Sequence, residues 1–234
     1  MEVRTLAGLA EAGQARGAVV VLDIFRASNT ILALLAAGAA EVRLLADLEQ
    51  ARALRDAHPD WLLAGERGGL IQPGFDGDNS PAHAATLRPA GRSVILTTSA
   101  GTQAVHRLGQ AGPVCYGSFA NAEAVVRALT TLAPERVNLL PMGLEAREPA
   151  REDDLAAFYL AERLAGRRPD FAAIRAELLA CDGAMRLRRL GQQDDLEFCA
   201  RLDSHELVPL VGFEQHPVAR PWPGQSPRER GGEA

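Results

Sequence analysis

The amino-acid sequence predicts an α/β fold, a three-layer α/β/α arrangement around a mostly parallel mixed sheet, with a helix-rich C-terminal third. Two observations support this prediction. Apolar runs typical of buried strands recur along the first 140 residues, and segments with helical periodicity separate them. Such alternation is typical of βαβ units with right-handed crossovers. After Pro149 the pattern becomes mostly helical.

The first clear strand covers residues 18–25, where a continuous apolar run indicates burial on both faces of a sheet. We expect Ser28 to cap the next helix and Gly38 to end it. A glycine-rich loop, 65–79, leads to a helix start at Ser80-Pro81. Further strands are predicted at 41–46, 61–64, 93–98, 113–116 and 136–140, and further helices at 47–58, around Val105 and at 122–132.

The remainder of the chain reads as three helical stretches and one last strand. The helical stretches are 150–166, 171–181 and 185–201, and the strand is 207–211. Residues 217–234 are rich in Pro, Gly and Arg, a composition that predicts a flexible tail. We therefore expect a single domain over residues 1–216, followed by a flexible C-terminal tail over 217–234.

Composition restricts the partners that the protein can have. The formal net charge is −5, with 47% hydrophobic and 24% charged residues. Nucleic-acid binding needs a basic surface, so none is expected. A small anionic substrate remains compatible, because a few arginines in a cleft are enough to bind one phosphate.

The cysteines and the apolar runs predict a location. Three cysteines without CxxC spacing favour a reducing compartment. The first 17 residues lack the apolar centre of a signal peptide, and the apolar runs are far shorter than the roughly 20 residues of a membrane span. We expect a cytoplasmic protein without membrane contact, and the sequence leaves its oligomeric state open, a homodimer included.

Polar side chains gather where the predicted strands end. In open α/β sheets, ligands bind at the carboxyl ends of the strands. Loops as long as 65–79 are usually functional in compact domains. The candidates are Asp23, Arg26, Ser28 and Thr30 after the first strand; Glu66 and Arg67 after the third; Asn79 and Ser80 at the end of the long loop; Thr97, Thr98, Gly101 and Thr102 after the fourth; and Ser118 and Asn121 after the next.

These residue types suit the handling of a phosphoryl group. Backbone N–H groups at helix starts favour anions. Arg26 and Arg67 can each make a bidentate contact with phosphate or sulfonate oxygens. Asp23 and Glu66 can hold Mg²⁺, which prefers one or two carboxylates together with waters and substrate oxygens. The sequence thus predicts metal-assisted hydrolysis of a phosphomonoester.

A structural interpretation of each residue stays open at this point. Asp23 can cap the next helix, residues 97–99 can form a turn, Arg67 can be a solvated loop side chain, and residues 76–79 can shape a turn. Other phosphate chemistries lack their signatures, since the sequence has no P-loop and no GxGxxG after the first strand. Phe25 stands where a haloacid-dehalogenase phosphatase would carry a second Asp.

Six stretches resemble, in order along the chain, the motifs of the 2-phosphosulfolactate phosphatase family. No single match is specific, whereas six in the same order are. The stretches are 22–30 (LDIFRASNT), 65–70 (GERGGL), 74–81 (GFDGDNSP), 97–102 (TTSAGT), 117–122 (GSFANA) and 196–203 (LEFCARLD).

The resemblance implies the three-layer fold already predicted and Mg²⁺-dependent hydrolysis of 2-phospho-3-sulfolactate to 3-sulfolactate and phosphate, a step of coenzyme M biosynthesis. It implies that Asp23, Arg26, Glu66 and Arg67 are catalytic, and that Asp23, Glu66 and Asp153 hold the metal. It also implies substrate contacts for the hydroxyl, amide and glycine positions given above.

The chain departs from the family pattern at three places. Ala100 replaces an Asn, Asp78 replaces a Gly, and the stretch 141–153 keeps only Gly143 and the pair Glu152-Asp153. Because these changes fall where substrate is expected, two alternatives stay open. One is a phosphatase of the same fold that acts on another small phosphorylated hydroxy acid, and the other is a non-catalytic anion-binding protein.

Overall fold

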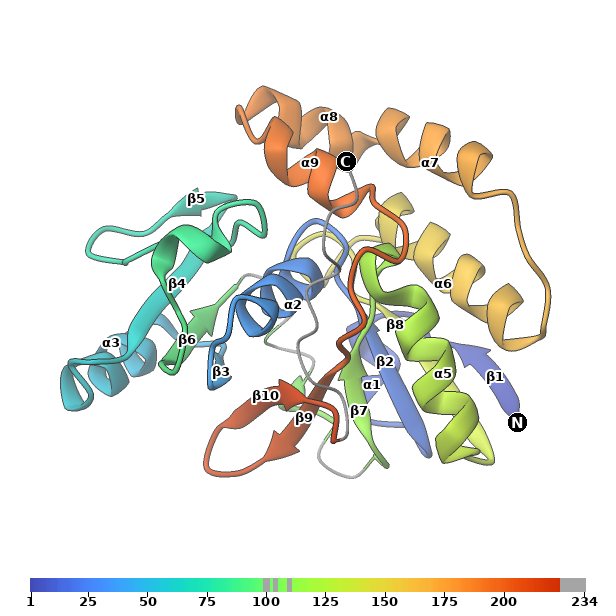
Figure 1. Ribbon diagram of the computed structural model, residues 1–234, viewed down its shortest axis with the longest axis horizontal. Helices are drawn as coiled ribbons and strands as arrows, with labels where there is room; N and C mark the ends of the chain where they lie inside the picture. The colour runs from blue at the N-terminus through green and yellow to red at the C-terminus, as the bar shows by residue number, and fades with distance from the viewer. Residues whose placement is uncertain (99–101, 103–104, 109–110, 224–234) are drawn as a thin grey trace.

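The computed structural model describes residues 1–98, 102, 105–108 and 111–223. Within these residues a single mixed sheet has the strand order β1-β8-β2-β7-β9-β10-β3-β6-β4-β5 (Figure 1). Its strands are β1 (Glu2–Thr5), β2 (Ala18–Leu22), β3 (Glu41–Leu45), β4 (Leu62–Arg67), β5 (Leu70–Ile71), β6 (Ser93–Thr97), β7 (Val114–Tyr116), β8 (Arg136–Pro141), β9 (Pro209–Phe213) and β10 (Pro217–Pro221).

Helices cover both faces of this sheet, so the three-layer α/β/α prediction is confirmed. The described helices are α1 (Leu9–Ala12), α2 (Ala27–Ala36), α3 (Leu48–Ala57), α5 (Ala122–Leu132), α6 (Arg151–Leu164), α7 (Phe171–Ala180), α8 (Asp182–Arg189) and α9 (Gln193–Cys199), with the 3-10 turns η1 (Ala84–Leu87) and η2 (Phe119–Asn121). The helix-rich C-terminal third is also confirmed, since α6 to α9 follow one another from residue 151.

Strand β2 shows how the layers are held together. Ala18, Val20 and Leu22 point into the core beneath α5 and α6, whereas Val19 and Val21 point into the core beneath α2. All five side chains are fully buried, as expected for a strand covered on both faces. The end of β2, from which Asp23 follows, is therefore fixed by apolar packing on either side.

The sheet consists of two parallel blocks joined by an antiparallel hairpin. One block is β1-β8-β2-β7 and the other is β3-β6-β4. Between them, β9 pairs with β7, β10 pairs with β9, and β3 pairs with β10, each time antiparallel. Helix α2 packs against strands of both blocks, because Ile31, Leu32 and Leu35 share one core with them.

This hairpin alters the predicted geometry of the strand ends. Three antiparallel pairings reverse the second block relative to the first, so a flat sheet would place their carboxyl ends at opposite edges. Neighbouring strands in a sheet rotate by roughly 20–25° relative to each other. Over the five steps from β2 to β6 this twist reduces the angle between the directions of β2 and β6 from antiparallel to about 80° or less. The carboxyl ends of β2, β4 and β6 consequently converge on one region.

The predicted tail is wrong at its start. Pro217–Pro221 forms β10 inside the sheet, where Val218 pairs with Arg43 of β3 and Gly212 of β9. Residues 224–234 lie outside the described part of the chain. The predicted cap is wrong too, because Ser28 lies inside the first turn of α2.

Other element bounds differ modestly. Strand β4 runs on to Arg67, so Glu66 and Arg67 belong to a strand and not to a loop. After Ser80-Pro81 the chain makes a turn and the 3-10 helix η1 instead of an α-helix. The helix expected around Val105 falls largely outside the described residues.

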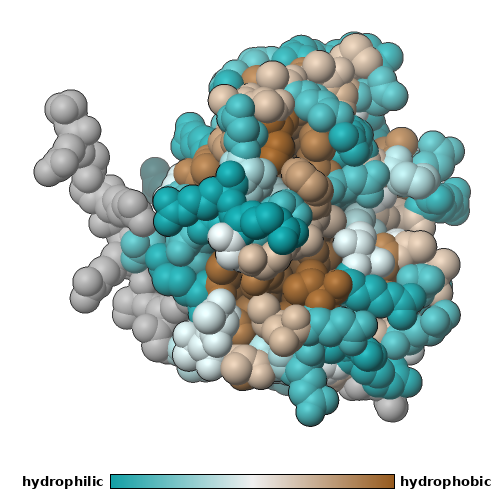
Figure 2. Space-filling model, turned by 90° about the vertical axis from the view of Figure 1, so that its right-hand side faces the viewer, coloured by the Kyte–Doolittle hydropathy of each residue, from teal (hydrophilic) through white to brown (hydrophobic). Residues whose placement is uncertain are grey.

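Apolar side chains also gather on the outer surface. The face in Figure 2, the side on which α5, α6 and β1 lie in Figure 1, has a hydrophobic band bordered by hydrophilic side chains. Phe158 of α6 and Leu132 of α5 are among the exposed large hydrophobic residues. A homodimer stays a prediction.

In the described part of the chain, no helix is both long and apolar enough to cross a bilayer.

We predict that Val218→Ala lowers the free energy of unfolding by about 2 kcal/mol or more, because it leaves a cavity in the middle of the sheet. Phe213→Ala, at a side chain that is 42% exposed on the same hairpin, serves as the control and should change it by less than about 1 kcal/mol. Urea denaturation measures both. Equal, small effects would mean that residues 217–221 behave as the tail predicted from sequence.

Candidate active site

A cleft of about 380 Å³ lies where the strand ends meet the C-terminal helices. Its lining combines residues from both blocks of the sheet with the loop after β8 and one side of α8. From the set predicted by sequence it brings together Asp23, Arg26, Glu66, Asn79, Thr98 and Asp153. Six candidates that are up to 130 residues apart in sequence thus share one cavity.

Two buried aspartates line the cleft. Asp23 follows β2, and Asp153 lies in the first turn of α6. Asp153 accepts hydrogen bonds from the backbone N–H groups of Ile24 and Gly143, each at 2.8 Å. Burial, with the charges of Asp23 and Glu152 nearby, raises the pKa of Asp153 well above its usual value. Negative charge is therefore concentrated here, and a bound cation would relieve it.

Asp23 also performs the structural task that sequence left open. Its Oδ1 accepts a hydrogen bond from the backbone N–H of Ala27 at 3.3 Å, at the start of α2. Its backbone N–H donates to the hydroxyl of Ser28 at 2.9 Å. These contacts aim the carboxylate from a fixed turn, so capping and lining the cleft are compatible.

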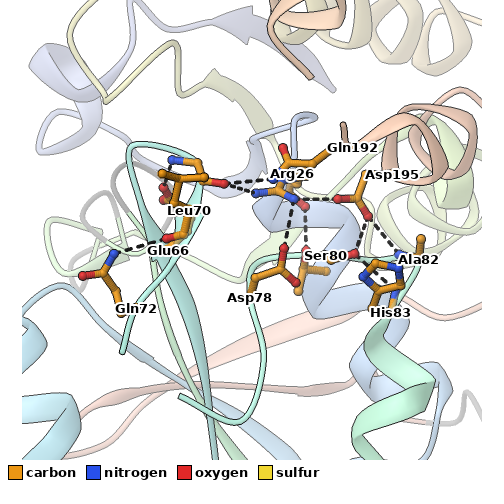
Figure 3. A network of polar contacts seen from close by, with 12 residues as sticks. Arg26, Glu66, Leu70, Gln72, Asp78, Ser80, Ala82, His83, Gln192 and Asp195 are labelled. Atoms are coloured by element: carbon orange, nitrogen blue, oxygen red, sulfur yellow. Dashed lines mark hydrogen bonds and ion pairs between the residues drawn. The ribbon is translucent and has the colours of Figure 1, made fainter. Parts of the chain in front are cut away.

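Arg26 is held by an ion pair that the sequence analysis missed. Its Nη1 donates to Asp195 at 2.5 Å and to Asp78 at 3.4 Å, and its Nη2 donates to the carbonyl of Gly69 at 3.3 Å. Asp195 also accepts from the Ser80 hydroxyl at 2.5 Å. Figure 3 shows Arg26 between Asp78 and Asp195. Since these contacts use only part of its five N–H donors, the guanidinium keeps donors for a ligand oxygen.

Two amide oxygens of the lining residues are buried without a partner among the described residues. They are Oδ1 of Asn79 and Oε1 of Gln192. The Nε2 of Gln192 donates to the carbonyl of Gly69 at 2.9 Å, which fixes the orientation of that amide. Because buried polar atoms normally have a partner, these oxygens indicate a donor or a cation in the cleft.

The donor set can be tested against a magnesium ion. Among the described residues, no group of three His, Cys, Asp or Glu side chains is arranged to hold a metal. Mg²⁺ asks for less, namely one or two carboxylates with neutral oxygens and waters. Asp23, Glu66 and the unpartnered oxygen of Asn79 line the same cleft and meet that requirement. Glu66 also accepts the N–H of Gly69 at 2.7 Å, which orients its carboxylate.

Arg67 lies outside the lining of the cleft. Its guanidinium donates to the carbonyls of Glu66 and Ala46 and to the hydroxyl of Thr97, at 2.6, 2.8 and 2.9 Å. Burial lowers its pKa. These bonds tie the ends of β3, β4 and β6 together, a structural task that also occupies the side chain of Thr97.

Other residues predicted to contact substrate make hydrogen bonds within the protein, and their substrate contacts stay predictions. The hydroxyl of Ser28 donates to Val21, and that of Thr30 donates to the carbonyl of Arg26. Ser118 and Asn121 form a capping box, and Asn121 Nδ2 donates to the carbonyl of Leu207 at 3.0 Å. Thr102 bonds back to Thr98. Gly101 lies outside the described residues.

Helix α8 forms a wall of the cleft that sequence reasoning did not assign. It contributes Gly183, Arg186 and Arg189 among others. A Cβ on Gly183 would lie 2.3 Å from Oε1 of Glu152, so this glycine permits the close contact between α8 and the start of α6. The signal for such a wall was the basic last turn of this helix.

The fold and the cleft define a class: a three-layer α/β protein with buried carboxylates and an arginine where strand ends converge. The family model described as 2-phosphosulpholactate phosphatase matches residues 5–212. The chain belongs to the 2-phosphosulfolactate phosphatase family, and 2-phosphosulfolactate phosphatases are phosphoric monoester hydrolases.

Curated relatives agree with this assignment. A protein of Deinococcus radiodurans named "probable 2-phosphosulfolactate phosphatase" is 38% identical over 208 residues, covering 82% of this chain and 86% of the relative. Proteins with the same name from Thermus thermophilus and Gloeobacter violaceus are 38% and 33% identical, over 82% and 81% of this chain and 87% and 86% of their own lengths.

We predict that Asp195→Asn lowers the free energy of unfolding by about 3–5 kcal/mol, because it leaves the buried guanidinium of Arg26 without its nearest and only fully buried carboxylate partner among the described residues. Asp194→Asn, at the exposed neighbouring acid on the same helix, is the matched control and should cost less than about 1 kcal/mol. Chemical denaturation of both variants decides. Similar losses would show that the ion pair does not hold α9 in place.

Proposed function

We propose that the chain hydrolyses 2-phospho-3-sulfolactate to 3-sulfolactate and phosphate, with Mg²⁺ as cofactor. Membership of the family supports the phosphatase chemistry. The observation that carries the proposal is the cleft itself, in which buried carboxylates lie beside Arg26 and an unpartnered amide oxygen. A phosphate dianion would meet strong repulsion in such a cleft unless a cation were present.

Asp23 and Glu66, with the amide oxygen of Asn79, are the residues that we propose to hold the metal. When bound, Mg²⁺ would neutralise charge on the phosphoryl oxygens and orient an attacking water. Asp153 bonds two backbone N–H groups, at Ile24 and Gly143. We assign it chiefly to positioning, since it locks the turn that carries Asp23, and its remaining lone pairs can still accept from a water in the metal's shell.

Arg26 supplies positive charge to the phosphoryl group in this proposal. Preorganised charge of this kind stabilises the transition state most when the protein has already fixed its position. Asp195 and Asp78 provide that fixation, so Arg26 needs no reorganisation as charge develops on the transferred group. Ser28 and Arg67, which the sequence assigned to the same task, are occupied by protein contacts instead.

Two further points belong to the proposal. The three cysteines are free and buried, which favours the reducing compartment expected of a cytoplasmic protein. A phosphatase for another phosphorylated hydroxy acid remains the second candidate, because Ala100 replaces the family's Asn and the stretch 141–153 departs from the family pattern.

Phosphate release separates these candidates. We expect the wild-type protein to release phosphate from 2-phospho-3-sulfolactate faster than from 2-phospholactate or 3-phosphoglycerate, and we expect EDTA to abolish release and added Mg²⁺ to restore it. Asp23→Asn should reduce the rate at least 100-fold while the protein stays folded, since the amide keeps an oxygen for the Ala27 N–H.

Asp47→Asn is the control for that variant, because Asp47 is an exposed acid that caps α3 through Gln50 and lies outside the lining of the cleft. It should leave the rate unchanged. Full activity of Asp23→Asn, or release that EDTA does not affect, would refute the metal assignment. Absence of release from all three esters would favour the non-catalytic anion-binding alternative.

A further inference from the structure

The lining of the cleft has seven acidic and four basic side chains, which makes its arginines informative. Four arginines line it, namely Arg26, Arg151, Arg186 and Arg189. Arg26 is paired with Asp195, and Arg151 is paired with Glu177 at 2.6 Å. In the described part of the chain, Arg186 and Arg189 have no carboxylate within ion-pair distance. They are thus the cations of the lining that remain available to an anionic ligand.

Their neighbour on the helix behaves differently. Arg188 donates to the carbonyl of Leu179 at 2.7 Å and does not line the cleft. Arg186 and Arg189 are three residues apart, so they project from the same side of α8. Two arginines of the last turns therefore face the cleft, while the third bonds to the chain behind it. Favourable interaction with the helix dipole applies to all three and does not explain this division.

Helix α8 is held firmly enough to place the two side chains. Ala184 and Leu187 pack with Leu196 of α9 and with Phe25, the residue next to Arg26. Gly183 lies against the carboxylate of Glu152, and the positive charge of Arg186 lowers the pKa of that carboxyl against a larger rise caused by its burial. The amide of Gln192, just beyond the helix, donates to the carbonyl of Gly69, which lies close to Leu190 and Arg186.

We propose that Arg186 and Arg189 bind the acid end of the substrate, and so select phosphomonoesters that carry a further carboxylate or sulfonate. The inference rests on the proposed function, in which Arg26 and the metal held by Asp23 and Glu66 bind the phosphate. The arginines of α8 then remain for the other anionic groups of the substrate. A guanidinium binds a planar carboxylate or two sulfonate oxygens through paired N–H donors. A phosphomonoester without a second acid group has no further anionic group for these arginines to bind, so it gains nothing from them.

The test compares variants of one helix on two esters. Arg186→Gln and Arg189→Gln should each raise KM for 2-phospho-3-sulfolactate about 10- to 100-fold, the loss expected for hydrogen bonds to a charged group, with little change in kcat. With p-nitrophenyl phosphate, which has no second acid group, their kinetics should equal those of the wild type. Arg188→Gln, the matched control, should leave both substrates unaffected.

Binding of 3-sulfolactate, measured by calorimetry, keeps the inference testable if turnover fails. Wild-type binding that weakens in Arg186→Gln and Arg189→Gln, but not in Arg188→Gln, supports the α8 assignment even if no ester is hydrolysed, in which case the proposed function alone falls. Equal losses on both esters, or no change in KM and in calorimetric affinity, would overturn the inference. Absence of 3-sulfolactate binding to the wild type would overturn it as well.

Discussion

The guanidinium of Arg26 meets the carboxylate of Asp195 at 2.5 Å, and both side chains are 3% exposed. This contact joins the start of α2 to α9, and through Ser80 and Ala82 it also holds the loop that carries Asn79. A buried ion pair adds little net stability over apolar packing, but losing one partner costs much. This ion pair instead fixes the relative positions of α2, α9 and the loop that carries Asn79, all of which carry or contact Asp195 or its partner.

Around this ion pair the charges have a simple distribution. Asp23 and Glu66, with Asp153 beside them, make the inner part of the cleft acidic, and the two arginines of α8 that have no ion pair with any described residue make part of its wall positive. A ligand with several anionic groups fits this pattern only if a cation accompanies one of them. The charge pattern therefore accounts together for the proposed metal, for the phosphate near Arg26 and for the acid group against α8.

Sequence predicted the elements whose signal is local. Strand β2 and helix α5 were found because an apolar run and helical periodicity are strong there. Strand β10 was missed because it has prolines at both ends and only three buried residues, Pro217, Val218 and Ala219. Its burial comes from pairing with β3 and β9. Since the hairpin separates the two parallel blocks, that omission also hid how the strand ends converge.

The same distinction applies to the site. Six residues that line the cleft were predicted because they stand next to strand ends or in motifs that resemble the family: Asp23, Arg26, Glu66, Asn79, Thr98 and Asp153. Asp195 was not, because its partner Arg26 is 169 residues away and only the fold joins them. Arg67 matched a motif as well as Arg26 did, yet its side chain donates hydrogen bonds to the main-chain carbonyls of Glu66 and Ala46 and does not line the cleft. A motif can thus identify a conspicuous residue without showing which way its side chain points.

A crystal structure of the protein with Mn²⁺, as a substitute for Mg²⁺, and 3-sulfolactate would show directly which residues hold the metal and the acid groups. We expect an anomalous peak bound by the carboxylates of Asp23 and Glu66 and by Oδ1 of Asn79, with an acid group of sulfolactate within hydrogen-bond distance of Arg186. A metal bound outside the cleft, or a ligand whose acid groups point away from α8, would contradict this expectation.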